Sequence, residues 1–259
     1  MLRPRIIPCL LVHKGGLVKT RRFADPKYVG DPINAVRIFN EKEVDELFVA
    51  DIDASIENRE PNYDLIRSLA AECRMPLCYA GGVTTADQFD RIVSLGVEKV
   101  AIGTAAIDGE RLIGEVVARV GSQSVVAVLD VRKSGLMRRY EVFTHNGSKK
   151  TGLSPADLAA KLEKSGVGEI VINSIDRDGE MQGYDLELVE QVRDSTSVPL
   201  TVLGGAGKLS DLDELIGRYP IIGAAAGSLF VFKGKYRAVL INYPTPEQKA
   251  QLGQDGETH

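Results

Sequence analysis

Histidine and cysteine are both scarce in this chain, which contains three of each among its 259 residues. The histidines are His13, His145 and His259, and the cysteines are Cys9, Cys73 and Cys78. The histidines are too scattered to indicate a metal triad, so we interpret each of them as a loop residue. An odd number of cysteines without paired metal-ligand spacing predicts free, mostly buried thiols. We therefore expect neither a metal site nor a cofactor.

Long hydrophobic runs are absent as well. No apolar stretch reaches the roughly 18 residues that a membrane-spanning helix needs. The N-terminal residues MLRPRIIPCLL lack the long apolar region and small-residue cleavage site of a secretory signal. The sequence therefore predicts a cytoplasmic protein that does not bind a membrane.

An excess of positive charge is also missing. Lys and Arg number 32 against 36 Asp and Glu, which gives a formal net charge of -4. This balance argues against a nucleic-acid partner, because such a partner requires a basic face. The chain is 44% hydrophobic and 26% charged, as is typical of a soluble globular protein of one or two domains.

Short apolar runs recur along the chain and predict alternating strands and helices. Eight candidate strands occupy residues 6–12, 46–52, 76–80, 99–103, 124–130, 169–174, 199–203 and 221–225. Helix start residues lie between several of them, at Asp31-Pro32, Thr85, Ser154-Pro155 and Ser210. Because strands that alternate with helices form parallel βαβ units, eight units in about 250 residues favour an α/β fold, the closed (β/α)8 TIM barrel.

The two halves of the chain repeat one another. ELFVADID from Glu46 matches EIVINSID from Glu169, and AGGVTTADQF matches LGGAGKLSDL, both with an offset of 123 residues. IGTAA near Gly103 matches AGSLF near Gly227 with an offset of 124. We therefore predict a single barrel built from two half-barrels, about 1–122 and 123–240, followed by a C-terminal tail, 241–259.

Glycine-rich loops follow four of the predicted strands, two in each half. The first pair is Gly81-Gly82 with Gly103-Thr104, and the second is Gly204-Gly205 with Gly227-Ser228. Loops at this end of such a barrel build the active site, and glycine lets backbone N–H groups approach phosphate oxygens closely. The repetition predicts two phosphate grips for an elongated ligand with a phosphate at each end, although tight turns alone would also use these glycines.

One position distinguishes the two halves. IIPCLLVHKGG, residues 6–16, and VVAVLDVRKSG, residues 125–135, are both apolar runs that end in a basic, glycine-containing loop. Asp130 in the second run falls on Leu11 in the first, at an offset of 119. Further aspartates end two other predicted strands at the same mouth, where loop capping is their alternative role. They are Asp51, Asp53, Asp176 and Asp178.

The stretches RIIPCLLVHKGGLVK, GSQSVV, VFTHNGSKKTG, SIDRDG and GGAGK resemble the cyclase subunit of imidazole glycerol phosphate synthase, an ammonia-using barrel of the histidine pathway. The resemblance runs from about residue 1 to residue 232. It implies that a glutaminase subunit docks under the barrel and that ammonia passes through the barrel core. It also implies that two aspartates at the mouth act as general acid and base on a bisphosphorylated ribonucleotide.

Carried onto this chain residue by residue, the resemblance implies a catalytic role for Asp130 and Lys19. The implied phosphate contacts are Gly82, Thr104, Asp178, Gly179, Gly205, Gly227 and Ser228. Leu11 replaces the second catalytic acid, and the loss of a placed proton donor or acceptor typically costs ~10²–10⁴-fold in rate. Other departures from the family pattern are Lys14, Thr20, Gly103 and Leu203, of which the last two alter the phosphate grips.

The segments LVKTRRFADPKYVGDPINAVRIFNEKEVDEL and FKGKYRAVLINYPTPEQKAQL resemble a branch of this family associated with acetamidino sugars of bacterial surface polysaccharide. That branch implies a barrel and glutaminase that supply ammonia to a separate sugar-modifying amidotransferase. Two alternatives remain, a histidine-pathway lyase that works despite Leu11 and a non-catalytic scaffold that keeps only the glutaminase contact. KYRAVLINYP is also rich in strand formers where a final barrel helix is expected.

Four charged residues lie at the starts of predicted strands, at the opposite end of the barrel. They are Arg5, Glu46, Lys99 and Glu169. Two cations and two anions alternate in strand order, so they can pair and close the bottom of the barrel. The charge pattern alone favours ordinary rim salt bridges, whereas the resemblance implies that these four positions form the family's gate at the ammonia entrance.

Overall fold

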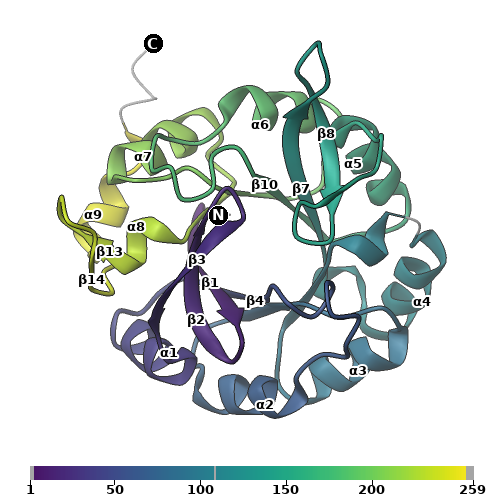
Figure 1. The fold of residues 1–259 in the computed structure, drawn as a ribbon, viewed down its shortest axis with the longest axis horizontal. Coiled ribbons are helices and arrows are strands. Elements are labelled where there is room, and N and C mark those ends of the chain that lie inside the picture. The colour runs from purple at the N-terminus through teal and green to yellow at the C-terminus, as the bar shows by residue number, and fades with distance from the viewer. Residues whose placement is uncertain (1–2, 108, 255–259) are drawn as a thin grey trace.

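A closed barrel of eight parallel strands forms the centre of the computed structural model, which describes residues 3–107 and 109–254 (Figure 1). The barrel strands are β1 (Arg5–His13), β4 (Leu47–Asp51), β5 (Leu77–Ala80), β6 (Lys99–Ile102), β7 (Val125–Ser134), β10 (Glu169–Ser174), β11 (Leu200–Leu203) and β12 (Gly223–Ala226). Hydrogen bonding follows the order β10-β11-β12-β1-β4-β5-β6-β7, and β7 pairs with β10 to close the ring. Each predicted strand overlaps one of these, and the (β/α)8 prediction is confirmed.

Helices surround the barrel and alternate with its strands (Figure 1). They are α1 (Pro32–Glu41), α2 (Tyr63–Glu72), α3 (Ala86–Ser94), α4 (Glu110–Val120), α5 (Pro155–Lys164), α6 (Leu186–Arg193), α7 (Leu209–Arg218) and α8 (Ser228–Val231). The short 3-10 helices η1 (Thr104–Ala106) and η2 (Ser122–Ser124) lie on either side of α4.

The helix starts follow the predicted capping residues in three of four cases. Asp31, Thr85 and Ser154 each precede the first turn of a helix, and Thr85 forms a reciprocal capping box with Gln88. The predicted cap at Ser210 is wrong, because the N-cap of α7 is Lys208, two residues earlier. The carboxylate of Asp211 accepts hydrogen bonds from the backbone N–H groups of Gly207 and Lys208, which moves the start of the helix toward the N-terminus.

Side chains along the barrel strands alternate between two apolar layers. In β1, Ile6 and Leu10 belong to the layer between strands and helices, whereas Ile7 and Cys9 belong to the barrel interior. The interior layer consists of Ile7, Cys9, Phe48, Cys78, Ala101, Val126, Val171 and Ala225. Such a period of two is the geometry of a pleated strand buried on both faces. Two cysteines are therefore buried thiols, as predicted, and burial raises the pKa of Cys9 to about 11.

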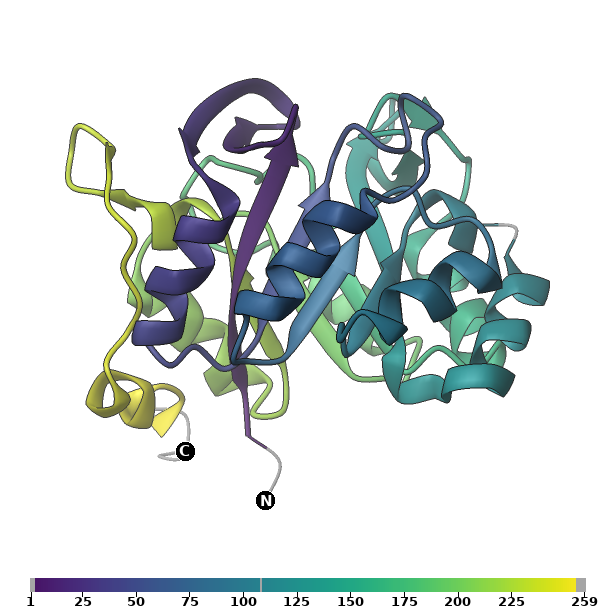
Figure 2. The ribbon, with the colours of Figure 1, turned by 90° about the horizontal axis from the view of Figure 1, so that it is seen from below.

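Three β-hairpins extend the barrel beyond the carboxyl ends of its strands. Their strands are β2 (Gly16–Arg21) and β3 (Ala24–Gly30), then β7 with β8 (Arg139–Thr144) and β9 (Lys149–Lys150), and finally β13 (Phe232–Lys233) and β14 (Ala238–Val239). In Figure 2 the arrowhead of β1 points toward the end of the barrel where the β13–β14 hairpin lies. The first two hairpins stand where the sequence predicted only basic loops.

After α8, a barrel helix of only four residues, the chain runs along the barrel wall toward its C-terminal tail. It passes through β14 and reaches α9 (Pro246–Gln251), which lies near the amino end of β1 (Figure 2). Tyr243 donates a hydrogen bond to Ile6 O at 2.9 Å, and Lys249 pairs with Asp45 at 2.8 Å. These contacts fix the tail beside the start of β1. His259 lies outside the described residues.

Candidate functional site

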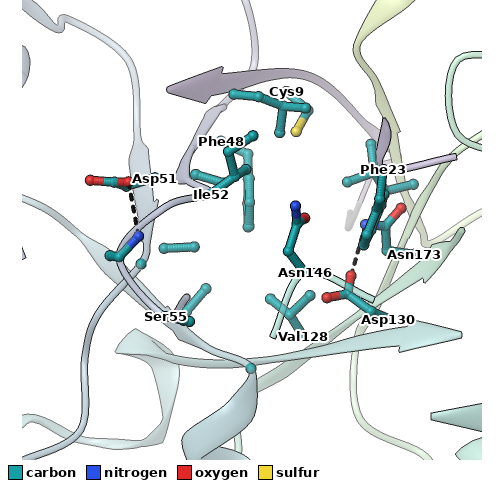
Figure 3. A pocket seen from close by; sticks show the side chains of 18 of the residues that line it. Cys9, Phe23, Phe48, Asp51, Ile52, Ser55, Val128, Asp130, Asn146 and Asn173 are labelled. Carbon is teal, nitrogen blue, oxygen red and sulfur yellow. Dashed lines mark hydrogen bonds between the residues drawn. The ribbon is translucent and has the colours of Figure 1, made fainter. Parts of the chain in front are cut away.

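The carboxyl ends of the barrel strands enclose a cavity of about 380 Å³ (Figure 3). Its apolar floor includes Leu11, Ala50, Val128 and Leu203. The structure brings the predicted mouth residues together in its walls. They are Leu11, Lys19, Gly82, Thr104, Asp130, Asp178, Gly179, Gly205, Gly227 and Ser228. A cavity of this volume can hold a small molecule.

Asp130 lies in a recess of the cavity wall and is bonded to a neighbouring strand. Asn173 Nδ2 donates a hydrogen bond to Asp130 Oδ1 at 2.9 Å, as Figure 3 shows. Asn173 Oδ1 is buried and has no hydrogen-bond partner among the described residues. Loss of water around the recess raises the pKa of Asp130 to about 7, and the bond from Asn173 only partly opposes this. The carboxyl group can therefore hold or release a proton near neutral pH, as general acid–base chemistry requires.

Leu11 occupies the corresponding place in the first half of the barrel. Strand register pairs Leu11 with Ala50 across β1 and β4, and it pairs Asp130 with Asn173 across β7 and β10. An apolar pair thus stands where the second half has a hydrogen-bonded polar pair. Sequence reasoning identified Leu11 but missed Asn173, although the offset of 123 places Asn173 on Ala50.

The first predicted phosphate grip combines the loops after β5 and β6. Gly82 has a φ of +74°, and a Cβ on it would lie 2.7 Å from the carbonyl oxygen of Arg59. A Cβ on Gly81 would lie 2.6 Å from the carbonyl oxygen of Asp51. Chain packing alone therefore requires both glycines, whether or not an anion binds. Thr104 begins η1 and lines the same cavity as these glycines.

The second predicted grip combines the loops after β11 and β12. Gly204 and Gly205 have φ values of +94° and +111°, so both hold conformations that favour glycine. A Cβ on Gly227 would lie 2.7 Å from Lys19 Nζ. Lys19 reaches this point from β2, is buried, and donates a hydrogen bond to the carbonyl oxygen of Cys9. Burial lowers the pKa of Lys19, so the amine beside this grip loses its proton more readily than a surface lysine does.

The four mouth aspartates are all engaged by the surrounding chain. Asp51 pairs with Arg59 at 2.7 Å, and Asp53 contacts His13 Nδ1 at 2.7 Å. Asp176 accepts a hydrogen bond from Lys133 N at 3.0 Å. Asp178 accepts hydrogen bonds from Thr20 Oγ1 at 2.7 Å and from Phe23 N at 3.1 Å. Contacts of this kind are consistent with loop capping, the alternative role that the sequence offered for some of these aspartates. Those of Asp178 hold the β2–β3 hairpin against the loop after β10.

The four predicted gate residues meet at the amino end of the barrel. Arg5 bonds to both Glu46 and Glu169, with a distance of 2.7 Å to Glu169. Lys99 Nζ lies 2.9 Å from each of the same two carboxylates. The four ion pairs form a closed cycle, which we call the charged ring.

The ring holds its charges although its acids are buried. Glu46 and Glu169 are 4% and 5% exposed. Burial alone would raise the pKa of Glu169, but Arg5 and Lys99 hold it below the ordinary value. Burial would likewise lower the pKa of Lys99, but Glu169 and Glu46 raise it. Each charge therefore depends on its neighbours, and removing one leaves another unpaired in a partly dry site.

Two further observations concern metal ligands and membrane-spanning helices, neither of which the sequence predicts. Within residues 3–107 and 109–254, no group of three or more His, Cys, Asp or Glu side chains is arranged to hold a metal ion. No helix in that part of the chain combines the length and apolar character that crossing a membrane demands.

The fold and the cavity define a (β/α)8 barrel with a recess at the carboxyl ends of its strands that is large enough for a small molecule. Residues 5–237 match the family described as histidine biosynthesis protein, and the chain belongs to this family. A Leptospira interrogans protein provisionally named imidazole glycerol phosphate synthase subunit HisF is 57% identical over 252 residues, which cover 97% of this chain and 99% of that protein. A Vibrio vulnificus protein provisionally named subunit hisF3 is 52% identical over 249 residues, 96% of each chain. The Alkaliphilus metalliredigens imidazole glycerol phosphate synthase subunit HisF is 37% identical over 230 residues, 89% of this chain and 91% of that one.

Proposed function

We propose that this chain is the barrel subunit of a glutamine-dependent ammonia-transfer complex. A glutaminase docks at the amino end of the barrel, on the face that bears the charged ring and Glu98, the residue just before β6. Ammonia enters through the charged ring and leaves at the mouth cavity. There a separate sugar amidotransferase uses it to make acetamidino sugars of surface polysaccharide, such as an O-antigen.

One observation carries this proposal, the contrast between the two ends of the barrel. All four members of the charged ring are present and paired, whereas an apolar Leu11–Ala50 pair stands opposite the polar Asp130–Asn173 pair at the mouth. The paired ring supports our assignment of an ammonia entrance, while the mouth keeps one acid that can exchange protons near neutral pH. A barrel that only passes ammonia to another enzyme, which we call the courier, needs the ammonia entrance but not the second catalytic acid.

A second candidate is the cyclase of histidine biosynthesis, a lyase. The matching family is described as histidine biosynthesis protein, and the similar Alkaliphilus protein is named as a subunit of imidazole glycerol phosphate synthase. Both descriptions favour this candidate. The glycine-rich loops of both predicted grips also line the cavity, which would then hold a ribonucleotide with a phosphate at each end. The two candidates differ in what must happen at the mouth, since the cyclase requires a working acid–base pair there.

One experiment separates these candidates. The chain is purified with its glutaminase and given glutamine together with either the histidine-pathway ribonucleotide or a sugar amidotransferase and its sugar substrate. Amination of the sugar with little cyclisation supports the courier. Turnover of the ribonucleotide is expected to fall ~10²–10⁴-fold below that of a two-aspartate cyclase measured in parallel.

The opposite results are equally informative. Ribonucleotide turnover comparable to the two-aspartate enzyme would establish the histidine-pathway lyase and refute the courier. If no glutaminase binds the chain, the courier fails, and the scaffold that keeps only the glutaminase contact fails with it. Leu11→Asp is a further variant, and we expect it to recover little cyclase activity because Gly103 and Leu203 also change the mouth.

A further inference from the structure

Exposed apolar side chains concentrate on the three hairpins at the mouth, which we define as segments 14–30, 133–150 and 232–240. Nine large hydrophobic residues are exposed among the described residues, and six of them lie on these hairpins. The six are Tyr28, Leu136, Met137, Tyr236, Val239 and Leu240. Leu136 and Tyr236 are the extreme cases, with exposures of 102% and 89%. Apolar groups gathered at one end of a soluble protein mark a contact surface.

Positive charge concentrates on the same three hairpins. They contain 13 Lys and Arg but only two acids, a net charge of +11, so the rest of the chain carries -15 to give the overall -4. The overall net charge therefore averages a positive end, formed by the hairpins, and a negative remainder of the chain. For this reason the net charge of the whole chain does not exclude a basic face at this end of the barrel, although the absence of a nucleic-acid partner stays a prediction.

Many of these cations have no acidic partner. Arg138, Arg139, Lys149, Lys150 and Lys235 are exposed and form no ion pair with any described residue. Lys133, in contrast, pairs with Glu187 at 2.7 Å. Repulsion among exposed like charges disfavours the free surface, and an acidic partner would relieve it.

The hairpins stand around the mouth, and the first approaches both of the others. A Cβ on Gly147 of the second hairpin would lie 3.0 Å from the ring of Phe23 in the first. Lys27 of the first hairpin lies over the ring of Phe232 in the third, 5.3 Å from its centroid. Arg237 of the third donates to the carbonyl oxygen of Gly179, which lines the cavity, at 3.3 Å. The second hairpin continues β7 past Asp130 and projects beyond the ring of helices in Figure 1. We call this surface the mouth face.

We propose that the mouth face binds an acidic surface of the enzyme that consumes the ammonia. This inference rests on the proposed function, because it places the acceptor where ammonia would leave the barrel. Exposed Tyr, Met and Arg side chains around a recess have the composition of a protein contact site. A partner that covers the recess would also keep ammonia out of bulk water.

Other occupants fit the mouth face less well. A second copy placed mouth to mouth would oppose two sets of hairpins that each carry a net charge of +11. A second copy placed mouth to flank would form a head-to-tail contact, which produces a ring or a filament rather than a closed pair. Nucleic acid and anionic membranes match the charge, but the apolar tips stand on separate hairpins around a cavity and not on one flat or amphipathic face.

The test measures binding of the purified sugar amidotransferase to the complex of this chain with its glutaminase. One variant carries Arg138→Glu, Arg139→Glu and Lys235→Glu, and a second carries Leu136→Ser, Met137→Ser and Tyr236→Ser. The matched control reverses three exposed cations on the outer helices, with Arg67→Glu, Arg111→Glu and Lys161→Glu. Circular dichroism and the rate of glutamine hydrolysis check that every variant is folded and active.

We expect each mouth-face variant to weaken acceptor binding by about tenfold or more, and the control to leave it within about twofold. Added salt should weaken binding of the unmodified complex and have less effect on the charge-reversed variant. Equal binding by all variants would overturn the proposal. So would stronger retention by phosphatidylglycerol vesicles, by duplex DNA or by a second copy of the chain, measured in the same buffer.

The design separates this inference from the proposed function. If the sugar is aminated from glutamine but the mouth-face variants behave as the control does, the ammonia courier stands and the mouth-face proposal falls. If the glutaminase does not bind, the proposed function falls, and acceptor binding by the barrel alone still decides whether the mouth face is used.

Discussion

The hydroxyl of Thr201 donates a hydrogen bond to Glu169 Oε1 at 2.6 Å, inside the amino end of the barrel. Strand register places Gly223 beside Thr201 across β11 and β12, and a Cβ at Gly223 would overlap this hydroxyl. Thr201 is 1% exposed. The absence of a side chain on Gly223 therefore makes room for a neutral group that holds one acid of the charged ring.

Thr201→Val should destabilise the chain, because it removes a donor to a buried carboxylate while keeping the shape of the side chain. The expected loss is about 1.5–3 kcal/mol in the free energy of unfolding, the usual range for hydrogen bonds to charged groups. Urea unfolding measures it. Thr201→Ser is the matched control and should retain most of the stability. A Val variant as stable as the Ser variant would mean that this bond does not hold Glu169.

Asp130 should make the folded chain less stable as pH rises, whereas an aspartate whose folded pKa is lowered makes it more stable as pH rises. Its folded pKa of about 7 lies above the unfolded value of about 3.9, so the folded state binds the extra proton between these limits. The stabilisation is complete below about pH 4 and is lost as pH rises to about 7, by roughly 4 kcal/mol at most.

The variant Asp130→Asn removes this titration and isolates its effect. As pH is lowered from 8 toward 5, the unmodified chain should gain unfolding free energy relative to the variant, because only the unmodified chain takes up the proton. Urea unfolding of both proteins at several pH values measures the difference, and the carboxyl carbon resonance of Asp130 reports the pKa directly. A midpoint near the ordinary aspartate value would show that the recess admits water.

The two phosphate grips should bind sulfate or phosphate ions. We expect one anion at Gly82 with Thr104 and another at Gly205 with Gly227 and Ser228, because both loop pairs line the same cavity. Soaking crystals in sulfate is the direct measurement. If both places stay empty at high concentration, the glycines serve only the close backbone packing that they also show.

The barrel was predictable because its strands and helices repeat simple periods. Buried parallel strands appear as short apolar runs, and residues such as Asp31 and Thr85 mark helix starts by capping chemistry. Leu11 was found because one half of the chain can be compared with the other. The half-barrel repeat itself stays a prediction.

The hairpins and two polar positions were not predictable in the same way. Segment 14–30 contains scattered basic residues, and its strands exist because β2 pairs with β1. Asn173 and Thr201 lie within apolar runs, and they gain importance only from Asp130 and Glu169, which are distant in sequence. Local pattern carries no information about such tertiary partners.

The charged ring provides the last prediction. Lys99→Ala or Glu169→Ala should uncouple glutamine hydrolysis from amination of the acceptor. Lys99 bonds to both ring acids at 2.9 Å, so its removal leaves two buried carboxylates with Arg5 as their remaining basic partner in the ring. The opened entrance would then let water in and ammonia out.

The measurement follows free ammonium and aminated acceptor in the same reaction. With the ring intact, most nitrogen released from glutamine should reach the acceptor, whereas the ring variants should release it into solution at a similar rate of hydrolysis. Arg67→Ala, on the exposed side of α2, is the control and should transfer ammonia normally. Because the ring variants keep the mouth cavity unchanged, unaltered transfer efficiency in them would show that ammonia does not enter through the ring, and the courier proposal would fail.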